Sequence, residues 1–136
     1  MPKIKRIHHI ALLVDDINTT LQFWQDILEI SPSHISNVPG ESARIAFLPL
    51  GGSEVELVQP VTGDSGLSRY LEKHGPGMHH LCLEVDDLEA IMLKLKSKGI
   101  QLINEQPKIG DDGRLYAFIH PRSTHGVLIE LYQQPK

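Results

Sequence analysis

The chain has 136 residues, of which 40% are hydrophobic and 22% are charged. This length allows one domain to bury a core without disulfides or a structural metal. The formal net charge is -4, and no basic run is concentrated anywhere in the sequence. Contacts to phosphates need a basic face, so the nucleic-acid-binding class is excluded and we expect no nucleic-acid partner.

The N-terminal sequence predicts the cellular location. Its apolar run, residues 10–14, is too short for a signal peptide or a membrane span. We therefore expect a cytoplasmic protein with no membrane partner. The single cysteine, Cys82, lies in an apolar segment, where a buried and inert thiol is the expected state.

The sequence contains an internal repeat. IHHIALLVDDI at residues 7–17 returns as MHHLCLEVDDL at residues 78–88, an offset of 71 residues. A second echo pairs GSEVELVQP, around Glu56, with HGVLIELYQQP, around Glu130. Two echoes in the same order indicate two copies of one supersecondary unit.

The spacing inside the two copies also agrees. His9 and Glu56 are separated by 47 residues, and His80 and Glu130 by 50. We therefore predict a single domain with an internal repeat. The domain spans residues 1–136. It consists of two copies of the repeat, at 5–60 and 77–133, and a linker at 61–76.

In the first copy, the opening apolar run alternates with a period of two and predicts a strand. Asp16 is placed to cap a helix that begins INTTLQF. The apolar residues of that helix recur at helical spacing; they are Ile17, Leu21, Trp24 and Leu28. Three further apolar segments predict strands near 33–38, 43–49 and 54–59.

The linker and the second copy continue the pattern. A short helical segment is expected from Gly66 to Lys73, within the Pro- and Gly-bounded linker. Asp87 is placed to cap the next helix, and Gly99 to end it. Apolar segments then predict strands near 101–104, 114–119 and 126–132.

Each copy is thus a β-α-β-β-β unit, and such a unit cannot cover both faces of its sheet alone. The predicted fold class is α+β, with two tandem modules pairing into a curved, barrel-like mixed sheet. In this arrangement, residues from both copies meet on a shared concave surface.

Strand alternation separates the two histidines of each HH pair. His9 is expected on the face that carries Ala11, with His8 on the opposite face. The same alternation separates His80 from His79. One histidine of each copy therefore points toward the shared surface.

Pseudo-symmetry brings together one His and one Glu from each copy, which gives His9, Glu56, His80 and Glu130 as candidate ligands. Each of them alone is readily explained as a structural residue. Together, two carboxylates buried in apolar strands call for a cation. Imidazole and carboxylate suit a divalent ion such as Zn, Co, Ni, Mn or Fe. Four protein ligands leave an octahedral ion two positions at which a bidentate oxygen substrate is polarised.

Long segments of the chain resemble the methylmalonyl-CoA epimerase family of the vicinal oxygen chelate superfamily. IHHIALLVDD resembles the first-strand metal motif, and LPLGGSEVELVQP the second ligand strand. DSGLSRYLEKHGPGMHHLCLEVDDL and KIGDDGRLYAFIHPRSTHGVLIEL are longer and more specific matches. The resemblance covers essentially the full length and implies the glyoxalase fold.

The resemblance implies His9, Glu56, His80 and Glu130 as ligands of one divalent ion, cobalt, manganese, zinc or nickel. It implies epimerisation of (R)- and (S)-methylmalonyl-CoA by removal of the proton α to the thioester, with Glu130 as a ligand that also acts as base. A small acyl-CoA is then the substrate, and a homodimer is the expected assembly.

The sequence departs from some family members at the second acid-base group. Those members carry a glutamate on the strand that reads ARIAF here, and this chain has Ile45 at that position. Glu41, Lys108 and His120 remain alternatives for the second group.

Two other functions fit the same scaffold. A glyoxalase I-like enzyme would use the same four ligands on a hemithioacetal, but the third and fourth matching segments favour the epimerase. A metal-free protein that sequesters a ligand typically lacks the four metal-binding residues, all of which are present here.

Overall fold

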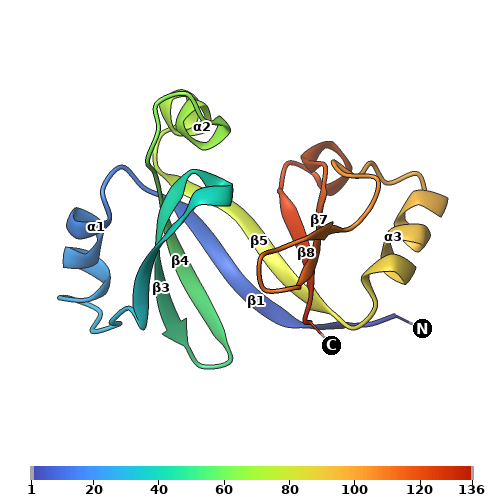
Figure 1. Ribbon diagram of the computed structural model, residues 1–136, viewed down its shortest axis with the longest axis horizontal. Coiled ribbons are helices and arrows are strands. Elements are labelled where there is room, and N and C mark those ends of the chain that lie inside the picture. The colour runs from blue at the N-terminus through green and yellow to red at the C-terminus, as the bar shows by residue number, and fades with distance from the viewer. Residues whose placement is uncertain (1, 136) are drawn as a thin grey trace. The chain divides into compact units, whose positions relative to one another are not determined.

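The computed structural model describes residues 2–135 (Figure 1). The helices are α1 (Ile17–Trp24), α2 (Gly66–His74) and α3 (Leu88–Ser97), with short 3-10 helices η1 (Pro39–Glu41) and η2 (Pro121–Thr124). The strands are β1 (Ile4–Leu13), β2 (His34–Val38), β3 (Ala43–Leu50), β4 (Ser53–Pro60), β5 (Gly77–Val85), β6 (Lys108–Ile109), β7 (Leu115–Ile119) and β8 (Ile129–Gln133). Both halves therefore run strand, helix, three strands, with α2 between them.

The strands form an eight-stranded sheet in the order β2-β3-β4-β1-β5-β8-β7-β6. β5 and β8 pair in parallel, whereas β3 pairs antiparallel with β2 and β4, and β7 with β6 and β8. The sheet is mixed and helices accompany it, so the predicted α+β class is confirmed. Within residues 2–135, no helix combines the length and the apolar character needed to span a membrane.

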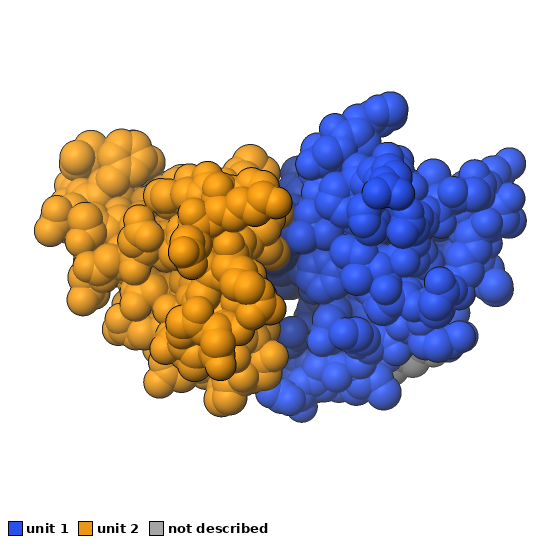
Figure 2. Space-filling view, turned by 90° about the horizontal axis from the view of Figure 1, so that it is seen from above, with its two compact units in different colours: residues 1–9, 80–136 blue, residues 10–79 orange. Residues whose placement is uncertain are grey.

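The chain divides into two compact units, coloured separately in Figure 2. Unit 1 contains Met1–His9 and His80–Lys136, and unit 2 contains Ile10–His79. The chain passes from one unit to the other between two adjacent residues of β1 and again between two adjacent residues of β5. Each unit has its own hydrophobic core.

In unit 2, the two faces of the sheet carry separate apolar clusters, because successive side chains of a strand point to opposite faces. Ile17 of α1 packs with one face, in a cluster with Val14, Ala46, Leu48, Val55 and Leu57. Leu67, Tyr70 and Leu71 of α2 pack against the other cluster, which consists of Ala11, Leu13, Ala43, Ile45 and Val58.

In unit 1, α3 supplies the helical side of the core. Its buried residues follow the helical spacing predicted for one apolar face, and they are Leu88, Ile91 and Met92. They pack in one cluster with Val85, Leu102, Ala117, Ile119 and Leu131. The core of unit 1 thus holds β5, β7 and β8 against a single helix.

The helices α1 and α3 begin in the predicted way. The side chain of Asp16 accepts a hydrogen bond from the backbone N–H of Asn18, and that of Asp87 from the N–H of Ala90. Each aspartate satisfies one backbone donor that the first helical turn leaves without a partner.

In each half, a glutamine from the last strand accepts a further hydrogen bond at the start of the helix. Gln59 Oε1 accepts a hydrogen bond from the backbone N–H of Ile17 at 2.8 Å, and Gln133 Oε1 from that of Leu88 at 2.7 Å. The same bond therefore ties the helix to the closing strand in both halves.

Two predicted elements differ from the structure. The helix predicted to continue to Leu28 ends at Trp24, because the backbone N–H groups of Asp26 and Leu28 bond five residues back, to Leu21 and Phe23. Leu28 is consequently 46% exposed.

The strand expected near 101–104 forms only an isolated bridge, between Leu102 and Ile119. The side chain of Asn104 accepts the hydrogen bond of the Phe118 N–H, which a strand carbonyl would otherwise take. The short β6 instead lies at Lys108–Ile109, next to the tight turn before β7.

Candidate metal centre

Three of the four predicted ligands come together in unit 1. His9 lies on β1, His80 on β5 and Glu130 on β8, which are neighbouring strands of the sheet. Cys82 pairs with Glu130 in the β5–β8 register, and His80 shares a strand face with Cys82, so the register brings Glu130 close to His80. His9 and Glu130 are buried, each 6% exposed, and His80 is partly buried.

The donor atoms of the three residues converge. His80 Nε2 lies 3.0 Å from Glu130 Oε1, and His9 Nε2 lies 3.5 Å from the same oxygen. The two Nε2 atoms are 3.2 Å apart, with the rings edge to face. One atom from each side chain is thus within 4.8 Å of the other two, close enough for all three to contact a single ion.

The charge state of Glu130 is suitable for a metal ligand. Burial alone opposes ionisation of this carboxyl, but hydrogen bonds from His80 and His9 outweigh it and lower its pKa from 4.5 to about 2. The carboxylate is therefore ionised at neutral pH. It is in the form that binds a cation or accepts a proton.

The donor set fits a divalent metal. Two imidazole nitrogens and one carboxylate oxygen are a combination found in metal sites that retain open coordination positions. The His9, His80 and Glu130 cluster is consistent with such a site, as predicted from the sequence.

The position of His8 differs from the prediction. Strand alternation placed it on the face opposite His9, yet His8 Nδ1 lies 2.8 Å from His9 Nδ1. The His8 ring also stacks on Tyr132 of β8, with ring centroids 4.3 Å apart. Regular alternation is therefore interrupted at this point of β1, beside the boundary between the units.

This contact is compatible with the tautomer of His9 that a metal ligand needs. If His9 binds a metal through Nε2, its proton resides on Nδ1 and is donated to Nδ1 of His8. His8 must then be the acceptor, with its own hydrogen on Nε2. A hydrogen bond of this kind, made by the other nitrogen of a ligand histidine, orients the ring toward the metal.

The fourth predicted ligand, Glu56, lies on β4 in unit 2. Its side chain is buried, and it pairs with Phe47 of β3 in the strand register. Its membership of the ligand set stays a prediction.

The residues considered for the second acid-base group have varied surroundings. Ile45 is 2% exposed and belongs to the unit 2 core. His120 caps η2, where its Nδ1 accepts a hydrogen bond from the backbone N–H of Arg122. Glu41 and Lys108 are both exposed. The structure therefore singles out none of these residues.

Cys82 was expected to be an inert core thiol, and it is fully buried. It nevertheless lies within donor distance of His8 and His9. Its position two residues after His80 on one strand would have indicated a place on the same face. No comparable pattern in the sequence could have identified His8.

Comparison with known proteins agrees with this geometry. The sequence profile of the Glyoxalase/Bleomycin resistance protein/Dioxygenase superfamily matches residues 8–118, which include His9 and His80. The chain belongs to this superfamily. The predicted resemblance to the vicinal oxygen chelate superfamily, and the glyoxalase fold that it implied, are confirmed.

Within the superfamily, the chain is similar to methylmalonyl-CoA epimerases. It is 36% identical to the mitochondrial methylmalonyl-CoA epimerase of Mus musculus over 132 residues, which are 96% of this chain and 74% of the mouse protein. A solved methylmalonyl-CoA epimerase in complex with methylmalonyl-CoA and NH4+ aligns with a TM-score of 0.87 and 28% identity, covering 97% of this chain and 96% of that one.

A hypothetical protein from Bacillus halodurans is also similar in structure, with a TM-score of 0.90 and 32% identity. The alignment covers 99% of this chain and 96% of that one.

Proposed function

We propose that this protein is a methylmalonyl-CoA epimerase that depends on a divalent metal ion. The observation that carries the proposal is the buried convergence of His9, His80 and Glu130 in a chain similar to epimerases of that name. The proposed substrate is an acyl-CoA whose acyl group bears a carboxylate next to the acidic carbon.

Glu56 completes the proposed ligand set as the partner of Glu130. The support comes from its equivalent place in the other half of the fold. Glu56 precedes Gln59 by three residues, and Glu130 precedes Gln133 by three. Each glutamine accepts a hydrogen bond from the first backbone N–H of the helix in its own half. Two carboxylates would balance the charge of a divalent ion, which favours its burial.

His9 and His80 are equivalent by the same measure. Each precedes the first residue of its helix, Ile17 or Leu88, by eight positions. The ligand set therefore consists of two equivalent pairs.

A bound divalent ion would polarise the thioester carbonyl and the free carboxylate of the substrate, which increases the acidity of the proton between them. Glu130 then accepts and returns that proton on one face. Its carboxylate, with a pKa of about 2, is a weak base that is fully ionised at neutral pH. Proton removal therefore depends on the increased acidity of the substrate.

The test is exchange of the α-proton of methylmalonyl-CoA in deuterated water. We expect rapid deuterium incorporation with inversion by cobalt-loaded protein, and loss of both after chelation. Glu130→Gln should reduce the exchange rate by about 100-fold or more, because the base is removed.

Glu84→Gln is the matched control. Glu84 is a buried carboxylate like Glu130, but it lies on β5 in a separate ion-pair cluster with Arg6 and Lys5. This variant should retain the wild-type rate. Absence of exchange by cobalt-loaded protein would refute the epimerase. Activity of that protein on the hemithioacetal of methylglyoxal would instead favour the glyoxalase-like alternative.

A further inference from the structure

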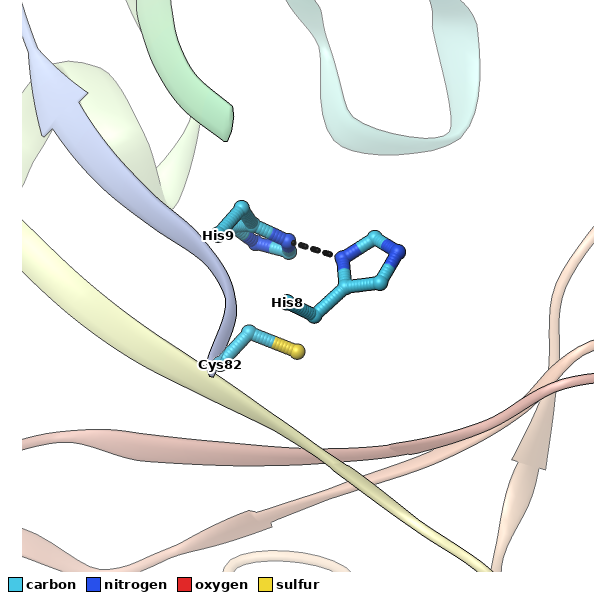
Figure 3. A group of neighbouring side chains, drawn as sticks. All are labelled: His8, His9 and Cys82. Atoms are coloured by element: carbon cyan, nitrogen blue, oxygen red, sulfur yellow. Dashed lines mark hydrogen bonds between the residues drawn. The ribbon is translucent and has the colours of Figure 1, made fainter. Parts of the chain in front are cut away.

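A second group of metal-binding atoms adjoins the candidate metal centre. His8 and His9 of β1 and Cys82 of β5 each offer a donor atom within 4.8 Å of the other two. Figure 3 shows the two imidazole rings meeting edge to face, with the thiol of Cys82 beside them. His9 and Cys82 are buried and His8 is partly buried, and all three belong to unit 1.

Different nitrogens of His9 face the two groups of neighbours. Its Nε2 lies near His80 and Glu130, at 3.2 and 3.5 Å. Its Nδ1 lies 2.8 Å from His8 Nδ1, on the other side of the ring. We propose that His8, His9 and Cys82 form a second site, which takes a soft monovalent cation such as Cu(I) or its analogue Ag(I).

The donor chemistry determines the class of ion. A thiolate with two imidazoles selects soft metals, whereas carboxylate and carbonyl oxygens select hard ones. When the cation binds, the Cys82 thiol releases its proton to solvent and both histidines bind as neutral ligands. One thiolate and one monovalent cation give a site without net charge, which is the least costly arrangement for a buried position.

The distances are compatible with this coordination. With the bond lengths found at zinc, about 2.3 Å to sulfur and about 2.0 Å to nitrogen, neighbouring ligand atoms lie roughly 3.3 to 4 Å apart. The donor atoms already lie within 4.8 Å of one another, and the His8 and His9 nitrogens need only move apart slightly from 2.8 Å.

The shared histidine makes the two sites mutually exclusive. A neutral imidazole has one lone pair available to a metal and carries its hydrogen on the other nitrogen. If Nδ1 of His9 binds the soft cation, Nε2 holds the hydrogen and no longer binds the divalent ion. A soft cation therefore displaces the divalent ion through His9 while leaving His80 and Glu130 untouched.

The test is a calorimetric titration of the whole metal-free chain with Ag(I) in chloride-free buffer. We expect one equivalent to bind, with an affinity lower by about 100-fold or more in Cys82→Ser and Cys82→Ala. The chain has one cysteine, so these two variants remove the only thiol.

His8→Asn separates a built site from simple capture by a thiol. Its amide oxygen keeps an acceptor for the Nδ1–H of His9 but is a poor ligand for silver. We expect Ag(I) affinity to fall by at least about tenfold in this variant. Wild-type affinity in His8→Asn would mean that a lone thiol binds the ion, and would overturn the proposal.

Competition with Co(II) is the second measurement. One equivalent of Ag(I) should lower the Co(II) affinity of the wild type by about tenfold or more and leave that of Cys82→Ala unchanged. Unchanged Co(II) affinity in silver-loaded wild type would contradict the exclusion. Failure of Co(II) to bind without silver would count against the proposed function alone, because the Ag(I) titration stands without it.

Discussion

At the scale of single residues, the contact between His8 and His9 connects the strand to the chemistry of the metal centre. The His8 ring is held by its stacking on Tyr132, and its Nδ1 faces the Nδ1 of His9 at 2.8 Å. A ligand histidine held in this way loses less freedom when it binds a metal, and His8 offers an acceptor for a hydrogen on the His9 nitrogen that faces away from the ion.

His8→Leu is therefore expected to lower the Co(II) affinity by about tenfold or more, because the acceptor for the His9 hydrogen is lost. His8→Asn should restore most of the affinity. The ¹⁵N chemical shifts of the His9 ring provide the direct measurement, with hydrogen on Nδ1 in the wild type and in His8→Asn. Equal Co(II) affinity in the Leu and Asn variants would show that His8 has no positioning role.

A second buried carboxylate makes a different contribution. Glu84 Oε1 lies 2.9 Å from Arg6 Nε and also accepts from Gln134, while its Oε2 lies 3.4 Å from Lys5. Burial raises the pKa of this carboxyl, but the Arg6 hydrogen bond and charge, with the Gln134 and Lys5 contacts, lower it overall.

A lowered pKa in the folded state means that the unfolded chain binds the proton first as pH falls. The Glu84 contribution to stability is therefore present above about pH 4.5 and is lost as pH falls through the lower folded-state value. We expect Glu84→Gln and Arg6→Gln each to weaken the dependence of the unfolding free energy on pH between 6 and 3. Urea unfolding of metal-free protein across that range provides the measurement, and an unchanged slope in both variants would refute the assignment.

At the scale of elements, the helix starts show how local sequence and strand pairing act together. Asp87 caps α3 through the N–H of Ala90, while Gln133 from β8 accepts the N–H of Leu88. The aspartate was recognisable from the sequence as a cap. The glutamine was not, because it is 45 residues from its donor and only the folded sheet brings them together.

Asp87→Ala is expected to lower the unfolding free energy by about 1 kcal/mol, because a donor of the first turn loses its acceptor. Asp111→Ala, in an exposed turn, is the matched control and should change it by less than about 0.5 kcal/mol. Urea unfolding at pH 7 measures both. A loss as large in the control as in Asp87→Ala would contradict the capping role.

The strand predicted near 101–104 does not form, and the reason is again a contact between residues far apart in the sequence. Its apolar residues do pack, since Leu102 is buried in the unit 1 core. Ladder formation is limited because the Asn104 side chain takes the N–H of Phe118, a tertiary contact that an apolar pattern does not reveal. The hydrophobic pattern predicted burial correctly, but it did not determine the backbone bonds.

At the scale of the whole molecule, repetition in the sequence was the most informative feature. It predicted the order of strands and helices in both halves, and it selected His9, His80 and Glu130 from among many histidines and carboxylates. His80 and Glu130 converge through the β5–β8 register, and His9 lies on β1, the strand next to β5. Glu56 was selected in the same way, and its equivalence to Glu130 extends to the glutamine three residues later.

Irregularities in the fold were beyond such reasoning. Regular alternation assigned His8 to the wrong face, because the strand departs from its period at the point where the chain passes between units. The identity of a second acid-base group also depends on tertiary packing, and Ile45 shows that the position used by some relatives is part of the core here.

Titration of the metal-free protein with Co(II) tests the central claim most directly. We expect one equivalent to bind with the absorption of a nitrogen- and oxygen-ligated ion. His9→Ala, His80→Ala and Glu130→Gln should each weaken binding by about 100-fold or more, and Glu56→Gln by at least about tenfold, whereas Glu84→Gln should bind as the wild type does. Wild-type affinity in the three cluster variants, or no stoichiometric binding by the wild type, would contradict the assignment of this cluster as the metal centre.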